Sequence, residues 1–118
     1  MSQRMIIEMG TGNDQHGQDY TKAAGRAIED ALRHSSLPII AQLAVSPADM
    51  RVQVTVGVQA PDQVDCDSLV GLLPRGTVTV TAVHGGLDLV NPDTSAVTVV
   101  ASAAIEVFLP PQTGWQLA

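Results

Sequence analysis

The sequence predicts an α+β fold: one mixed or mainly antiparallel sheet of four to five strands, with one long and one short helix packed on one face. Two observations carry this prediction. Residues 20–34 have one strong helical pattern, residues 50–59 alternate apolar and polar side chains, and every odd-numbered residue from Val97 to Leu109 is apolar. Alternation at every second residue marks strands buried on one side, which favours an antiparallel or mixed sheet over an all-parallel one.

The N-terminal third contains the first strand and the long helix. Met5–Met9 is apolar apart from Glu8 and predicts a strand, and a glycine-rich loop follows over residues 10–17. Asp19 is placed to cap the helix of residues 20–34, because its carboxylate can accept the free amides of the first turn. Ser35–Pro38 ends that helix. Residues 39–45 fit a helical turn or an extended piece.

The rest of the chain is rich in β-strand patterns separated by turns. Pro74 ends a short helix, Gly85-Gly86 separates two strands, and Asn91–Thr94 is a turn. The expected elements are a strand at 50–59, a helix at 65–73 and strands at 77–84, 87–90 and 96–109. We expect a single domain, 1–118, with residues 110–118 as a C-terminal tail.

Composition limits the classes of function. The chain is 45% hydrophobic and 15% charged, as expected for a globular domain. Twelve acids against six bases give a net charge of −6, which argues against a nucleic-acid partner. The single cysteine excludes an internal disulfide and a cysteine-rich zinc site. Five apolar-rich residues before Gly10 are too few for a signal peptide, and no stretch has the length of a membrane span, so a cytoplasmic protein is expected.

The strand pattern also predicts association between copies. With only three aromatic residues, the core is small and aliphatic. The long strands leave the second face of the sheet Thr-rich and uncharged. Such a face is either solvated or packed against a neighbouring subunit, and we expect a homo-oligomer.

The residues whose side chains most suggest a chemical role lie in the loop Gly10–Gly17. Asp14 and His16 are two residues apart, so in an extended segment both point to the same side. An ionised aspartate beside His16 favours proton abstraction near neutral pH. The alternative is that Asp14 caps the turn and His16 merely fills a loop. Lys22, the only lysine, is either an anion partner or activated amine for the same site, or a solvated surface residue.

His84 either completes this site from a neighbouring strand or has a structural role. The predicted catalytic residues are Asp14, His16 and Lys22, and the predicted substrate-binding residues are Gly10, Gly12, Gly17, His84, Gly85 and Gly86. Gly10-x-Gly12-x-x-Gln15 lacks the third small residue of the dinucleotide fingerprint. We expect no cofactor and no metal site.

The segments Ile7–Gly17, Asp19–Ala24 and Ser36–Pro38 resemble a family of conserved hypothetical proteins founded on a Listeria sequence, with the signature GxGxDxHG. This resemblance implies that Gly10, Gly12, Asp14, His16 and Gly17 are the important positions. Residues 46–54 are more weakly similar to a segment of the ring-opening amidohydrolases of the cyanuric acid hydrolase type. Those enzymes have three α/β repeats around a central site, so this second resemblance implies a ring of copies.

Two hypotheses of function follow. In the first, an oligomer binds a small metabolite at the Gly10–Gly17 loop and carries out proton transfer of the hydrolase, isomerase or lyase type. His16 would be the base, with Asp14 orienting it. In the second, the protein is a non-catalytic metabolite-binding or assembly module in which the loop is structural.

Overall fold

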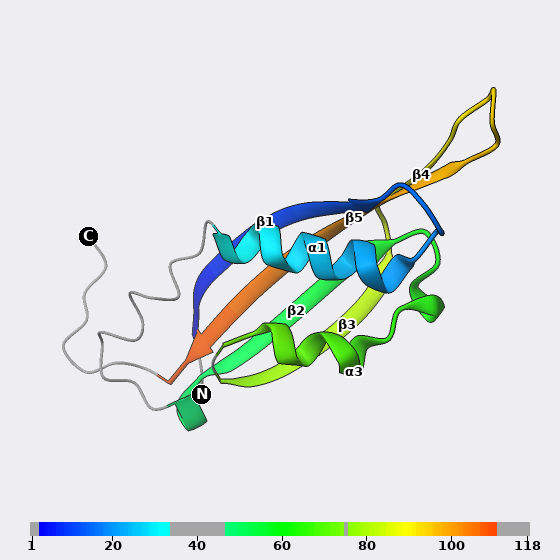
Figure 1. The fold of residues 1–118 in the computed structure, drawn as a ribbon. Coiled ribbons are helices and arrows are strands. Elements are labelled where there is room, and N and C mark those ends of the chain that lie inside the picture. Colours follow the sequence, from blue (N-terminus) through cyan, green and yellow to red (C-terminus); the bar gives the residue numbers. More distant parts are fainter. Residues whose placement is uncertain (1–2, 34–46, 75, 111–118) are drawn as a thin grey trace, which may run out of the picture.

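The computed structural model describes residues 3–33, 47–74 and 76–110 (Figure 1). Its elements follow the predicted order, and the final strand, which forms one continuous element, is the longest. They are β1 (Gln3–Asp14), α1 (Tyr20–Arg33), the 3-10 turn η1 (Pro47–Asp49), β2 (Arg51–Val58), η2 (Pro61–Gln63), α3 (Cys66–Leu69), η3 (Val70–Leu72), β3 (Thr77–His84), β4 (Leu87–Val90) and β5 (Val97–Leu109). The predicted α+β class is confirmed, and the predicted second helix divides into α3 and η3.

The strands form one mixed sheet in the order β1-β5-β2-β3, with β4 paired to β5 beyond the end of β2. β5 runs antiparallel to β1, β2 and β4, whereas β2 and β3 are parallel. The connection from β1 through α1 therefore returns to β2 with β5 inserted between them. Figure 1 shows α1 and α3 on the same face of the sheet.

The core lies between this helical layer and the sheet. Small side chains on α1 allow it to lie close to the strands: Ala23, Ala24, Ala27 and Ala31 are fully buried. The valines of β2 at 52, 54, 56 and 58 and the odd-numbered residues of β5 from Val99 to Leu109 form the opposite wall. Asp19 caps α1 as predicted, since its Oδ1 accepts the Lys22 amide at 3.0 Å.

The first strand is longer than predicted. β1 continues to Asp14, so Gly10–Asp14 is strand and not loop, and the loop is reduced to residues 15–19. Glycine disfavours strands in general, which is why the sequence pattern indicated a loop. Here the pairing of Gly10 with Ala103 and of Gly12 with Ala101 continues the ladder to β5, and the strand passes directly under α1.

β4 and the start of β5 extend from the body of the sheet as a hairpin arm, which we define as residues 87–100. Figure 1 shows the arm projecting away from the helices and the other strands. Two backbone bonds close its tip, from the Asn91 amide to the Ala96 oxygen and from the Ser95 amide to the Asn91 oxygen, both 2.8 Å.

Three predicted features lie outside the described residues: the helix end at 35–38, the undecided segment 39–45 and the tail from residue 111 onward. In the described ranges, no helix is long and apolar enough to span a membrane.

Candidate functional site

Two of the three glycines in the predicted loop lie beneath α1. A Cβ on Gly12 would lie 2.3 Å from the Ala27 nitrogen, and one on Gly10 would lie 2.4 Å from the Ala31 nitrogen. Any side chain at either position would therefore push the helix off the strand. Gly17 is at the loop itself, with a φ of 93° that favours glycine.

Asp14 is buried at the end of β1, with 1% of its surface exposed. Its Oδ2 accepts the Asp19 amide at 2.9 Å, and its Oδ1 lies 3.5 Å from the Lys22 Nζ and 3.8 Å from an Arg26 nitrogen. The Asp19 amide hydrogen bond lowers the pKa of Asp14 below its ordinary value; burial opposes this, and Lys22 and Arg26 reinforce it. The carboxylate holds together the loop and the first turns of α1.

Arg26 is a member of this cluster that the sequence analysis did not identify. Its guanidinium also donates to the Asn13 carbonyl at 2.6 Å. The helical spacing of four residues between Lys22 and Arg26 places both on one side of α1. That spacing was visible in the sequence, but nothing in it showed that β1 would run alongside.

His16 is exposed and lies apart from the Asp14 cluster. Among the hydrogen bonds and ion pairs of the described residues, none joins Asp14 to His16. His16 instead lines a cleft of about 330 Å³ between two loops, with Gln15, Gly17 and Gln18 on one side and Ser95, Ala96 and Val97 on the other. The structure thus brings Asp14 together with Lys22, and His16 together with the strand that leaves the tip of the hairpin arm.

Both walls of this cleft are fixed by hydrogen bonds. On the first, the Gln18 side-chain nitrogen donates to the Tyr20 hydroxyl at 3.1 Å, which in turn donates to Asp88 Oδ2 at 2.6 Å. Asp88 Oδ1 is buried and has no hydrogen-bond partner among the described residues. On the second, the tip of the arm is closed by the two backbone bonds described above. Gln18 and Ser95 have left-handed φ values of 51° and 62°.

Among the described residues, the strand edge at Val97 has no pairing strand. Because the Ala96 oxygen accepts a bond from Asn91, the residue after β4, alternation along the strand directs the backbone N–H and C=O of Val97 toward the side of β5 on which β1 lies. Pairing with β1 ends where Asp14 lies opposite Val99. The Val97 donor and acceptor therefore face the cleft. Sequence reasoning missed this feature, since it depends on where two strands distant in the chain stop pairing.

His84, Gly85 and Gly86 lie elsewhere. β3 and β1 are three strand spacings apart, about 14 Å, so His84 is not adjacent to Asp14. Gly85-Gly86 carries the chain across the end of β2, where the Gln59 side-chain nitrogen donates to both glycine carbonyls at 3.0 Å. Gly86 has a φ of 60°, and a Cβ there would lie 2.2 Å from the Val100 oxygen. These glycines allow the chain to pass close to the backbones of Gly57 on β2 and Val100 on β5.

No group of three or more His, Cys, Asp or Glu side chains in the described part of the chain is arranged to hold a metal ion. The His16 imidazole lines the cleft, whereas the Asp14 carboxylate is engaged by the Asp19 amide, Lys22 and Arg26.

The model of a family described as conserved hypothetical protein (Lin0512_fam) matches residues 4–107. The chain belongs to this family. The match covers every described strand and helix of the Lin0512 fold, apart from the ends of β1 and β5.

A solved structure is similar to this chain in both sequence and fold. The chain is similar to a crystal structure described as an FtsZ-like protein of unknown function from Nostoc punctiforme PCC 73102, with a TM-score of 0.81. The two sequences are 36% identical, and the alignment covers 93% of this chain and 98% of the other. No curated protein matches the chain, so the resemblance to ring-opening amidohydrolases stays a prediction.

Proposed function

We propose that this Lin0512-family protein binds a small polar molecule carrying an amide or peptide-like unit in the cleft between Gln15–Gln18 and Ser95–Val97. The observation that carries the proposal is the strand edge at Val97, where β1 pairing has ended and, by alternation, the backbone N–H and C=O have no strand partner among the described residues. An amide presents one donor and one acceptor, which complement the pair on the strand. The side chains of Gln15, His16 and Ser95 add further donors and acceptors around it.

Size and rigidity support binding. A volume of about 330 Å³ is at the lower end for small-molecule sites, so the ligand is a small metabolite or a piece of one or two residues of peptide. Both loops are held by internal hydrogen bonds, so little conformational entropy would be lost on binding. Apart from His16, the lining residues are uncharged, which favours a neutral ligand over a strong anion or cation.

The proposal combines the two hypotheses drawn from the sequence. The contacts of Gly10, Gly12 and Asp14 support a structural role for that half of the motif. Proton transfer through an Asp14–His16 pair is not proposed, since the Asp14 carboxylate is engaged by Asp19, Lys22 and Arg26. His16 is proposed as a binding residue.

A nuclear magnetic resonance titration tests this proposal. N-acetylalanine methylamide, which carries the required donor and acceptor, is added to ¹⁵N-labelled protein. We expect saturable shifts in the amides of residues 15–18 and 95–97. His16→Ala should weaken the affinity about fivefold or more, while His84→Ala, the same change at the other described histidine, should leave it unchanged. Shifts spread over the whole molecule, or equal effects of the two variants, would contradict the proposal.

A further inference from the structure

The face of the sheet opposite the helices, which we term the open face, carries five of the six large hydrophobic residues that are exposed in the described part of the chain. The register places Ile7 opposite Glu106 and Met9 opposite Ala104, so their side chains share the face of the even-numbered residues of β5. The same pairing rule adds three residues from β3 and β4. The exposed large hydrophobic residues of this face are Ile7 (46%), Met9 (71%), Val83 (43%), Leu87 (55%) and Leu89 (52%).

These side chains form two ridges with a shallow strip between them. Ile7 and Met9 on β1 make one ridge, and the residues of β3 and β4 make the other. Between them, β5 and β2 carry small residues where Gly57 lies opposite Ser102 and Thr55 opposite Ala104, and longer side chains where Gln53 lies opposite Glu106. Small central residues allow a second sheet to approach to the usual spacing of about 10 Å, with the ridges interdigitating at the sides.

Charge on the open face distinguishes it from the rest of this acidic molecule. Of the acids in the five strands, Glu8, Asp14 and Asp88 point to the helical side, and only Glu106 is on the open face. Glu106 is paired with Arg4 at 3.2 Å, and the Arg51 guanidinium lies 4.0 Å from the centre of the Phe108 ring. The face is therefore close to neutral in a chain of net charge −6. Two copies can approach through it with least mutual repulsion.

The area is sufficient for a specific contact. From Thr98 to Phe108, β5 spans about 33 Å, and four strands are about 19 Å wide. The open face thus offers about 600 Å² per copy. Two such faces, if fully covered, bury about 1,200 Å² in total, which reaches the lower limit of stable interfaces.

From these observations we infer that the open face is covered by a second copy of this chain, packed sheet against sheet. The inference is independent of the cleft and its ligand. A nucleic acid or an anionic membrane would need unpaired cations, whereas the two arginines here already contact Glu106 and Phe108. A self-complementary face with apolar ridges fits its own copy.

Sedimentation velocity on the full chain from 5 to 200 µM tests the inference. We expect a species heavier than the 12.3 kDa monomer, with a dissociation constant inside this range or below it. Leu89→Lys and Met9→Lys should raise that constant at least tenfold, because each places an ammonium group in the apolar contact.

Val90→Lys is the matched control. Val90 is 61% exposed and adjacent to Leu89 on β4, but it points to the opposite face of the arm. Val90→Lys should leave the mass unchanged. Circular dichroism verifies that all three variants are folded. A monomer at 200 µM, or equal effects of Leu89→Lys and Val90→Lys, would overturn the inference.

Discussion

At the scale of single residues, Asp14 has the most consequential contacts in the N-terminal segment. One buried carboxylate satisfies the amide that opens α1 and neutralises two cations of the helix. The same residue was predicted to orient His16 for catalysis. Its position at the end of β1, and not in a loop, gives it these partners.

Asp14→Asn should lower the free energy of unfolding by about 1–3 kcal/mol at pH 7, because it removes a buried charged acceptor. The pKa of Asp14 is lowered in the folded state, so its stabilising effect is complete above the ordinary value of 3.8 and is lost as the pH falls through the folded-state pKa. Urea denaturation at pH 7, 5 and 3 measures this. The wild type and the variant should converge toward pH 3; a constant difference would argue against the carboxylate as its source.

Gly12→Ala should lower the free energy of unfolding by about 3 kcal/mol, because a Cβ 2.3 Å from the Ala27 nitrogen forces α1 away from β1. Gly71→Ala is the control, since no atom lies within 4 Å of a Cβ at that position. Thermal unfolding should show a large loss for the first variant and almost none for the second. Equal midpoints would mean that the close approach of strand and helix is not required.

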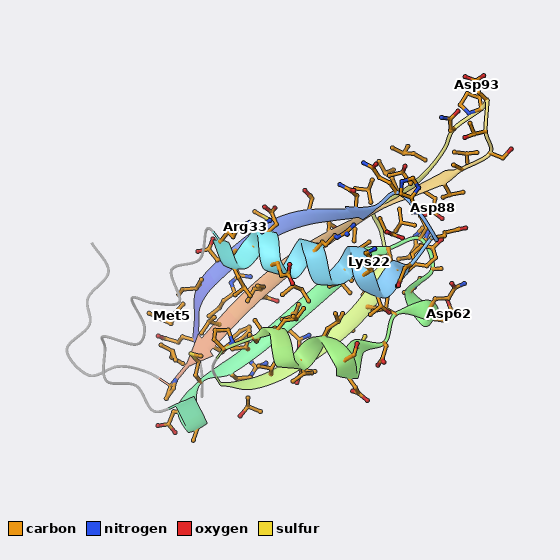
Figure 2. All side chains as sticks on the ribbon, in the orientation of Figure 1. Met5, Lys22, Arg33, Asp62, Asp88 and Asp93 are labelled. Atoms are coloured by element: carbon orange, nitrogen blue, oxygen red, sulfur yellow. The ribbon has the colours of Figure 1, made fainter. Side chains whose placement is uncertain are left out.

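At the scale of elements, the hydrogen bond between Tyr20 and Asp88 links the first turn of α1 to the hairpin arm. Figure 2 shows Asp88 at the base of the arm and Asp93 at its tip. The hydrogen bond to the Asp88 carboxylate raises the pKa of Tyr20; burial and the aspartate charge add to this, while the Gln18 side chain opposes it. The link fixes the arm relative to one wall of the cleft.

Tyr20 is the only tyrosine in the chain, so tyrosinate absorbance at 295 nm follows this group alone. The titration midpoint should lie above the ordinary value of 10.0, and Asp88→Asn should lower it toward that value. The stability contributed by this bond is therefore present below pH 10 and lost as the pH rises through the Tyr20 pKa. Asp93→Asn, the same change at the tip, should leave the midpoint unchanged; if both variants behave alike, the bond to Asp88 is not the cause.

At the scale of the whole molecule, the described helices cover one side of the sheet, and no described helix lies on the other. The packing between these helices and the strands lies on the first side. The exposed apolar residues gather on the second, where the molecule has least negative charge. The proposed contact between copies and the proposed ligand cleft thus occupy different parts of the structure.

Raising NaCl from 50 to 500 mM should strengthen self-association several-fold. Each copy carries a net charge of −6, and salt screens this repulsion while an apolar contact is little affected. Sedimentation equilibrium at the two salt concentrations measures the change. Association that weakens with salt would instead indicate an interface held by ion pairs. Arg4→Gln, which leaves the Glu106 carboxylate unpaired on the open face, should weaken the association.

The sequence by itself determined the α+β class, the long helix with its Asp19 cap and the one-sided strands β2 and β5. Each of these depends on local periodicity or on a capping residue, so residues close in the chain carry the information. The second helix and the turn at 91–94 were predictable for the same reason.

Only the tertiary structure decided the conformation of the glycine-rich segment. Gly10 and Gly12 have a strand conformation because they pair with β5, and they must be glycine because α1 lies against them, a contact between residues 14 to 21 positions apart. The separation of His16 from Asp14, the free edge at Val97 and the bond from Tyr20 to Asp88 likewise depend on β1 and β4 lying on either side of β5. No local pattern encodes strand order, because it is set by which buried faces pack together in three dimensions.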